Sequence, residues 1–159
     1  MLADLYIDPD TGARSLRATA PLKPGHAVCT FSASEVLNHP TRFTLQLDET
    51  RHILLSPEPL WYTNHSCAPN VFFDTETMEL MVLSPVGPGE ELRFFYPSTE
   101  WTMAEPFDCT CGAPNCLGRI SGAAALSDEV LARYRLTPYV TSKWRERGAA
   151  SPPDAPAIA

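Results

Sequence analysis

Three of the five cysteines lie close together, in the segment C-T-C-G-A-P-N-C at residues 109–116. Gly112 and Pro114 bend the chain between the thiols, so the three sulfurs can converge on one point. Structural zinc takes four ligands in a tetrahedron, which leaves this segment one ligand short. A fold that contains this loop must therefore bring a further ligand to it from a distant part of the chain.

The best candidate for the fourth ligand is Cys67, in the motif N-H-S-C-A-P-N at residues 64–70. The remaining cysteine, Cys29, stands inside the apolar run H-A-V-C-T-F and is typical of a small buried hydrophobic residue. Free or redox-active thiols are the alternative interpretation of the same cysteines.

The sequence shows no targeting or membrane segment. Its first residues, M-L-A-D-L-Y-I-D-P-D, lack the basic and apolar regions of a signal peptide, and no apolar run approaches the roughly 20 residues that cross a bilayer. We therefore expect an intracellular protein, cytoplasmic or nuclear depending on its source, with no membrane partner. Disulfides are unfavourable in a reducing compartment, so metal binding is the first interpretation of the cysteine spacing.

Length and charge set further bounds. A chain of 159 residues corresponds to one domain, and a hydrophobic fraction of 44% is sufficient for a packed core. The net charge of -7 argues against direct nucleic-acid binding, which needs clustered lysine and arginine. A basic partner is favoured, although many cytosolic proteins are acidic without such a partner.

Short apolar runs separated by turn-forming residues predict a mainly β fold. Proline, glycine, asparagine and aspartate end each run before it reaches the length of a typical helix. Many short strands with few helical patterns indicate small sheets folded over one another rather than a doubly wound sheet. The predicted strands cover residues 3–7, 26–31, 42–48, 52–55, 70–73, 80–83 and 91–96.

Helical signals are confined to the C-terminal part of the sequence. Ser127 is a typical N-cap, with Asp128 in the first turn of a short helix. Pro138 can begin a second helix, which should end near Gly148. The segment that follows contains little that could pack, and we expect a flexible tail over residues 149–159.

Three motifs together resemble a known family. The N-H-S-C-A-P-N motif is followed by G-E-E-L-R-F-F-Y at residues 89–96 and then by the cysteine segment. In this order, over roughly residues 1–120, they resemble the SET-domain protein-lysine methyltransferases with a post-SET zinc segment. The resemblance implies a mainly β SET-domain fold of small curved sheets with a knot-like threaded segment, plus short C-terminal helices.

The resemblance also implies a division of the chain and an activity. The SET domain would cover residues 1–103, the post-SET zinc-binding segment 104–122, and the short C-terminal helices 123–148. The implied activity is S-adenosylmethionine-dependent methylation of a lysine side chain in a protein or basic peptide. A histone tail is one candidate substrate.

Individual residues take roles from the same resemblance. Tyr96 matches the catalytic tyrosine, and Phe94 and Tyr62 would line the substrate channel. For the aromatic residues among these candidates, packing in the core or on the surface is the alternative interpretation. The residues that would hold S-adenosylmethionine are Arg14, Asn64, His65, Tyr96 and Trp101, and those that would hold zinc are Cys67, Cys109, Cys111 and Cys116.

Phe94 carries an expectation about the product. A tyrosine at this position of the family can hold a water molecule that blocks a second methylation, whereas phenylalanine leaves the space open. The resemblance therefore implies a di- or trimethylated lysine.

One departure from the family pattern supports a second hypothesis. The N-terminal cofactor loop is expected near residues 11–19, where Ala13 and Ser15 replace common glycines. A chain with weakened cofactor binding would be a catalytically weak SET-like module that binds a basic peptide. Titration with S-adenosylmethionine separates the two hypotheses.

Overall fold

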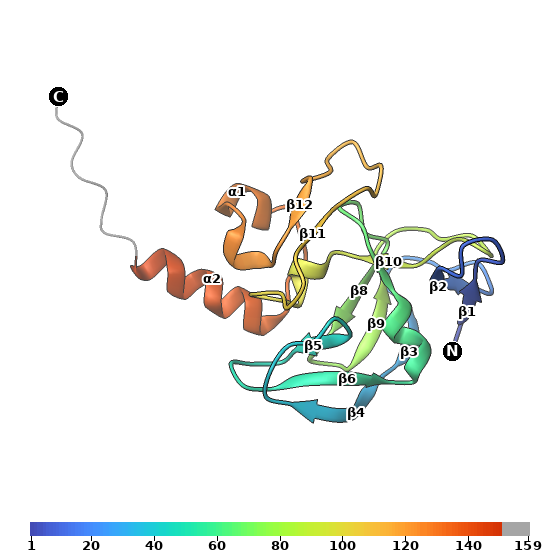
Figure 1. The fold of residues 1–159 in the computed structure, drawn as a ribbon, viewed down its shortest axis with the longest axis horizontal. Helices are drawn as coiled ribbons and strands as arrows, with labels where there is room; N and C mark the ends of the chain where they lie inside the picture. Colours follow the sequence, from blue (N-terminus) through green and yellow to red (C-terminus); the bar gives the residue numbers. More distant parts are fainter. Residues whose placement is uncertain (151–159) are drawn as a thin grey trace.

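The computed structural model describes residues 1–150, and its strands form five small sheets (Figure 1). The strands are β1 (Ala3–Ile7), β2 (Arg14–Ala18), β3 (Ala27–Thr30), β4 (Ser32–Leu37), β5 (Thr44–Gln46), β6 (His52–Ser56), β7 (Asn64–His65), β8 (Val71–Asp74), β9 (Glu79–Val82), β10 (Arg93–Phe94), β11 (Phe107–Asp108) and β12 (Arg119–Ile120). The helices are η1 (Glu58–Tyr62), η2 (Tyr96–Ser98), η3 (Ala123–Ala125), α1 (Asp128–Leu131) and α2 (Pro138–Ala150).

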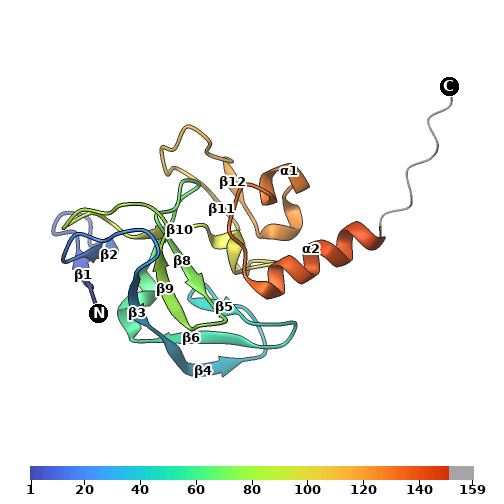
Figure 2. The ribbon, with the colours of Figure 1, turned by 180° about the vertical axis from the view of Figure 1, so that it is seen from behind.

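Two sheets have three strands, in the orders β3-β9-β8 and β4-β6-β5, and the others are the pairs β1-β2, β7-β10 and β11-β12. Figures 1 and 2 show the hairpin β1-β2 at one side of the molecule and helices α1 and α2 at the other, with the three-stranded sheets between them. The prediction of a mainly β fold made of small sheets, with few short helices, is confirmed.

A parallel contact joins two distant segments. Strand β7 pairs in parallel with β10, so that Asn64 lies opposite Arg93 and His65 opposite Phe94. The backbone N–H of Ser66 donates to the Phe94 carbonyl at 3.0 Å, which continues the pairing beyond the strand. The two motifs that suggested the family in the sequence are therefore in direct contact.

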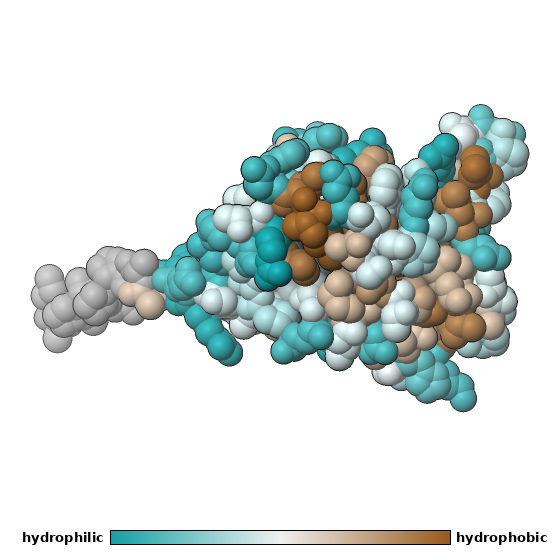
Figure 3. All heavy atoms as spheres, turned by 90° about the horizontal axis from the view of Figure 1, so that it is seen from below, coloured by the Kyte–Doolittle hydropathy of each residue, from teal (hydrophilic) through white to brown (hydrophobic). Residues whose placement is uncertain are grey.

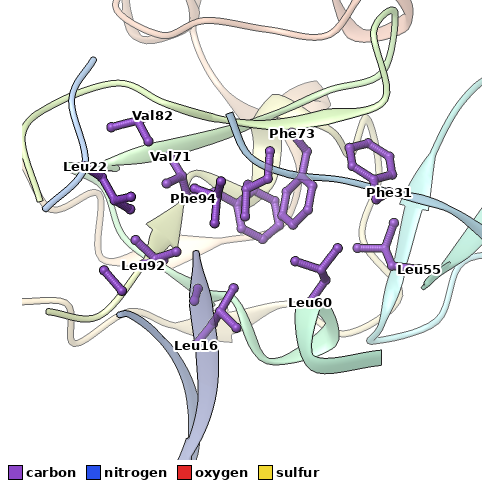
Figure 4. Packing of buried hydrophobic residues seen from close by; sticks show 14 of the residues in the cluster. Leu16, Leu22, Phe31, Leu55, Leu60, Val71, Phe73, Val82, Leu92 and Phe94 are labelled. Atoms are coloured by element: carbon purple, nitrogen blue, oxygen red, sulfur yellow. The ribbon is translucent and has the colours of Figure 1, made fainter. Parts of the chain in front are cut away.

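Buried apolar side chains from both three-stranded sheets and from β2 form the main core (Figure 4). Phe73 is completely buried at its centre, where its ring meets Phe31 edge-on at 5.5 Å and Phe94 at 4.8 Å. Leu16 and Leu92 are also completely buried and join the N-terminal hairpin to this core. The core thus extends up to the residue predicted to line the substrate channel.

The segment expected as a cofactor loop has a defined structure. The Asp8 carboxylate accepts hydrogen bonds from the backbone N–H groups of Asp10 and Thr11 and shapes the turn that ends at Gly12. Gly12 has a φ of 72°, which favours glycine. Residues 14–18 then form β2 rather than a loop, because Leu16 and Ala18 alternate into the core.

Strand prediction was less accurate where apolar patterns were absent or short. Strand β4 was not predicted, because five of its six residues, S-A-S-E-V-L, are exposed. The strand expected over residues 91–96 is restricted to Arg93 and Phe94, and Tyr96 begins the 3-10 helix η2. The Tyr96 backbone N–H donates to the His65 side chain rather than to a strand carbonyl, so the pairing does not continue to Tyr96.

The C-terminal helices confirm the capping signals. The Ser127 side chain accepts from the backbone N–H of Val130 at 3.3 Å at the start of α1. Helix α2 begins at Pro138 as predicted but continues to Ala150, so the tail expected from residue 149 was placed two residues too early. The remainder of that predicted tail, residues 151–159, lies outside the described residues.

The face drawn in Figure 3 is mostly hydrophilic or intermediate, with hydrophobic atoms gathered in small patches. Within residues 1–150, the exposed large hydrophobic side chains are those of the first strand and its N-terminal neighbours, together with Val36. No helix in that range is both long enough and apolar enough to cross a bilayer.

The core makes a direct prediction about stability. Replacing the completely buried Leu80 by alanine should lower the free energy of unfolding by about 2–5 kcal/mol, because it removes apolar burial and leaves a cavity. The same change at Leu5, which is 36% exposed on β1, should cost less than about 1 kcal/mol. Urea unfolding of both variants measures the difference, and equal losses would contradict this description of the core.

Candidate functional site

A cavity of about 690 Å³, here called the central cavity, is lined by residues of β2, β5, β7 and β10 and by residues 103–111. Its volume is within the range of pockets that bind small molecules. Five of the residues predicted to bind cofactor or substrate or to catalyse lie on its wall: Arg14, Asn64, His65, Phe94 and Tyr96.

Tyr96 lies on the wall with its hydroxyl held in place. The hydroxyl donates to the backbone carbonyl of Thr63 at 3.3 Å, and the ring packs against His65 at 5.1 Å and Phe94 at 4.7 Å. Burial raises the pKa of the Tyr96 hydroxyl to about 12, an effect that Arg42 reduces. The hydroxyl therefore stays protonated at neutral pH, so it can orient a ligand but is a poor base.

His65 connects Tyr96 to the cysteine cluster. Its Nδ1 accepts from the backbone N–H of Tyr96 at 3.2 Å, and its Nε2 lies 3.4 Å from the Cys67 sulfur. Burial lowers the pKa of His65 to about 4, so the ring is neutral at pH 7. Since Nδ1 is the acceptor, the proton is assigned to Nε2, which points it at the sulfur.

Asn64 and Arg14 form a hydrogen-bonded edge of the cavity. The Asn64 amide donates to the Arg14 carbonyl at 3.0 Å and to the Glu91 carboxylate at 2.8 Å. The Arg14 guanidinium donates to the Tyr62 hydroxyl at 2.7 Å. Tyr62 itself is not among the residues that line the cavity, so its contact with the cavity is indirect, through Arg14 and Phe43.

Phe94 was expected either to line the substrate channel or to pack in the core, and its position is compatible with both. Its side chain is 7% exposed and belongs to the core, yet it also lines the central cavity. Phe95, the next residue, faces away and stacks on Tyr134 at 3.6 Å between ring centroids. Phe94 and Tyr96 both line the cavity, and their rings are 4.7 Å apart.

Trp101 does not lie on the cavity wall. It packs against a second apolar cluster formed by Ala123, Leu131 and Val140, and Arg147 lies 5.6 Å from its ring. This position corresponds to the packing role that was the alternative to stacking on a cofactor.

The four cysteines proposed from the sequence do converge. The sulfur atoms of Cys67, Cys109, Cys111 and Cys116 all lie within 4.8 Å of one another. A tetrahedral zinc site with bonds of about 2.3 Å separates its sulfurs by about 3.8 Å, so the cluster could hold zinc.

The surroundings of Cys67 also suit a metal ligand. Its sulfur accepts from the backbone N–H of Leu117 at 3.4 Å, and its carbonyl accepts from the Tyr134 hydroxyl at 2.7 Å. Burial raises the pKa of the Cys67 thiol to about 12, so its thiolate requires a nearby cation. Cys29 lies apart on β3.

The cysteine cluster and the central cavity share a wall. Cys109 and Cys111 line the cavity as well as belonging to the cluster. Phe107, just before them, contacts the rings of His65 at 5.5 Å and Tyr96 at 5.8 Å. Phe107 was not predicted as a site residue, and its position inside the short strand β11 offered no sequence signal.

Two further residues of the site were missed. Glu91, in the G-E-E-L motif, accepts a hydrogen bond from Asn64 and forms a salt bridge with Arg93 at 2.6 Å. It therefore holds both side chains in place at the edge of the cavity. Glu100 lines the cavity as a buried carboxyl. An acidic residue in an exposed-looking segment, S-T-E-W, gave no reason to expect burial.

Parts of this chain are similar in sequence to known proteins. The model of the family described as "SET domain" matches residues 13–97. "Methyltransferase flvH" of Aspergillus flavus is 52% identical over 83 residues, which are 51% of this chain and 47% of that protein. "Histone-lysine N-methyltransferase, H3 lysine-36 specific" of Gibberella zeae is 34% identical over 130 residues, which are 67% of this chain and 14% of that protein.

A solved structure shows the same fold. The structure described as "KRYPTONITE in complex with mCHH DNA, H3(1-15) peptide and SAH" matches with a TM-score of 0.53 and 19% identity, over 74% of this chain and 29% of that one. The chain thus spans about half the length of the first relative and much smaller parts of the other two proteins.

The cysteine geometry predicts one bound zinc ion per chain. We expect Cys111→Ser to lose the metal, because three thiolates leave the tetrahedron incomplete. Cys29→Ser, which removes a thiol outside the cluster, should retain it. Elemental analysis of the purified proteins decides the matter, and wild-type protein without zinc, or Cys111→Ser with a full complement, would contradict the assignment.

Proposed function

The chain belongs to the SET domain family, and on that premise we propose that it is an S-adenosylmethionine-dependent protein-lysine N-methyltransferase. The observation that carries the proposal is the meeting of three groups at one cavity. Tyr96, Phe94 and the Asn64-His65 segment all line it, although the first two come from the motif at residues 89–96 and the third from the motif at residues 64–70.

The central cavity suits the proposed cofactor in size and chemistry. S-adenosylmethionine would supply an electrophilic methyl group on a sulfonium and would present a carboxylate and an adenine to the protein. The guanidinium of Arg14 would bind the cofactor's carboxylate, and the backbone of Asn64 and His65 would offer hydrogen-bonding atoms to its adenine. Trp101 is left out of this set, because it lies in the second apolar cluster.

Catalysis in this proposal consists of positioning a neutral amine. A lysine with a pKa of about 10.4 is neutral only about once in 2,500 molecules at pH 7, so its ammonium must lose a proton. Apolar walls favour that loss, and Phe73, Leu45 and Phe94 provide them. The protonated Tyr96 hydroxyl, anchored by Thr63, then orients the amine for in-line attack.

The proposed substrate is a lysine in a basic protein or peptide. The names of several relatives include histone H3 lysine 36, and the KRYPTONITE structure contains an H3 peptide. The net charge of -7 also favours a basic partner. A histone tail is therefore the first substrate to test, and a nuclear location would follow from it.

The expectation of no direct nucleic-acid contact stays a prediction. The acidic composition supports it, but the KRYPTONITE structure contains DNA, and this chain covers only 29% of that protein.

The alternative of a catalytically weak peptide-binding module rested on the missing glycines at residues 11–19. In the structure this segment is a capped turn followed by β2, and both Ala13 and Ser15 line the central cavity. Tyr96 lies on the same wall, which supports the enzyme rather than the binding module.

The proposal is tested by supplying S-adenosylmethionine with an isotopically labelled methyl group together with an array of lysine-containing histone peptides. Transfer of label to lysine is the expected result. Peptide binding without cofactor binding, measured by calorimetry on the same protein, would instead identify the binding module.

The Tyr96 hydroxyl gives a second prediction. Tyr96→Phe should lower turnover by at least about a hundredfold while cofactor affinity and thermal stability change little, because only the positioned hydroxyl is lost. Tyr139→Phe is the matched control, since it removes a hydroxyl that donates a hydrogen bond to Glu49 outside the central cavity. Parallel losses of activity and stability in Tyr96→Phe would show a packing role instead.

Phe94 predicts the number of methyl groups transferred. A first methyl group adds bulk, so a second transfer needs free space beside the amine, and Phe94 offers no hydroxyl to hold a water there. We expect di- or trimethyl-lysine from the wild type and a shift toward monomethyl-lysine in Phe94→Tyr. Phe72→Tyr, which adds a hydroxyl outside the central cavity, controls for the chemical change itself.

Mass spectrometry of peptides at complete substrate consumption measures these products. A wild-type reaction that stops at one methyl group would refute the role given to Phe94.

A further inference from the structure

We propose that the Glu100 carboxyl forms a binding subsite for a primary alkylammonium group, the head of the substrate side chain that enters the central cavity. The inference rests on the proposed function and adds a substrate-binding residue to it. It is carried by the place of Glu100 in the fold, by its burial and by a carboxyl oxygen without a partner.

The backbone fixes Glu100 close to Tyr96. Its N–H donates to the Tyr96 carbonyl at 3.2 Å, and its carbonyl accepts from the N–H of Ala123 at 2.9 Å. The next residue, Trp101, donates its N–H to the Gln46 side chain at 3.1 Å. These hydrogen bonds hold the backbone at Glu100 between η2, η3 and β5. Glu100 and Tyr96 line the same cavity.

One oxygen of the Glu100 carboxyl is buried without a partner. The residue is 7% exposed, and its Oε1 is a buried atom with no hydrogen-bond partner among residues 1–150. No arginine, lysine or histidine of that range forms a salt bridge with it. A buried acceptor left in this state costs free energy, which calls for an explanation.

The other acidic residues on the cavity wall are already accommodated. Glu91 pairs with Arg93 and accepts from Asn64, and the Asp108 side chain pairs with Arg119. Glu105 is exposed to solvent. Asp8, also on the wall, accepts from the backbone N–H groups of Asp10 and Thr11. Glu100 is therefore the carboxyl on this wall with an oxygen, Oε1, that has neither a hydrogen-bond partner among residues 1–150 nor contact with solvent.

The fold tolerates this carboxyl because its charge is suppressed when no ligand is bound. Burial raises the pKa of Glu100 well above its usual range, against the lowering effect of the Gln46 backbone N–H. A cation that enters beside the carboxyl favours the ionised form, and the displaced proton passes to solvent. The ion pair holds the entering side chain as its ammonium, so the subsite acts in substrate binding, before the proton loss that attack requires.

The surroundings select an alkylammonium group rather than a bare metal cation. The wall next to Glu100 includes Leu45, on the adjacent strand β5, and the cavity also contains Phe73 and Phe94. Apolar side chains suit the methylene stem of a lysine-like chain, and the carboxyl suits its charged end. The cofactor is assigned to Arg14, Asn64 and His65, which belong to β2 and β7.

Binding measurements on the full chain test the proposal without requiring methyl transfer. The probes are n-butylammonium, which reproduces the end of a lysine side chain, and n-butanol as its uncharged counterpart. Glu100→Gln keeps the shape of the side chain and removes its charge. Glu76→Gln makes the same change on an exposed carboxyl outside the central cavity and is the matched control.

We expect Glu100→Gln to weaken n-butylammonium binding at least about tenfold, the effect of losing a charge-assisted contact, with n-butanol affinity unchanged. Glu76→Gln should bind both probes as the wild type does. Thermal unfolding of each variant shows whether it is folded, and Glu100→Asp, which retains the charge, should bind n-butylammonium more tightly than Glu100→Gln.

A second titration separates substrate from cofactor. S-adenosylmethionine carries a cationic sulfur and S-adenosylhomocysteine does not, so the ratio of their affinities should be equal in wild type and Glu100→Gln. A fall in that ratio with intact n-butylammonium binding would assign the carboxyl to the cofactor and overturn the proposal. Equal n-butylammonium affinity in wild type and Glu100→Gln would also overturn it.

These outcomes are independent of the proposed activity. Loss of n-butylammonium binding in Glu100→Gln with no methyl transfer by the wild type would refute the activity alone. Methyl transfer with an unaffected n-butylammonium affinity would refute the subsite alone.

Discussion

The parallel contact between β7 and β10 is the interaction on which the rest of the site depends. It is short, with two residues in each strand, but it places Asn64 and His65 against Arg93 and Phe94. Asn70 reinforces it, because its side chain accepts from the Arg93 N–H and donates to the Glu91 carbonyl. Two segments that are far apart in the sequence therefore act as one rigid unit.

This unit connects the cysteine cluster to the central cavity. His65 accepts from the Tyr96 N–H on one side and faces the Cys67 sulfur on the other. A metal held by Cys67 would thus fix the histidine ring, and the ring would fix the backbone of Tyr96. Cys109 and Cys111 add a second connection, since they belong to the cluster and to the cavity wall.

The parts that could be predicted from the sequence were those with a strong local pattern. The cysteine spacing and the motif around Cys67 led to a cluster that the structure brings together, and the apolar runs located most of the longer strands. The polar strand β4 and the two-residue strands carry no periodicity. The burial of Glu100 and the packing of Trp101 against the second apolar cluster depend on tertiary structure, which residue type does not reveal.

Hydrogen exchange at the backbone amides of Ser66 and Tyr96 tests most directly whether the parallel contact between β7 and β10 couples the cysteine cluster to the central cavity. Both amides donate within the β7-β10 unit, to Phe94 and to His65. In zinc-loaded protein they should exchange slowly, and removal of the metal with a chelator should accelerate both, together with the loop at residues 109–116. Faster exchange confined to that loop, with Ser66 and Tyr96 unchanged, would contradict the account.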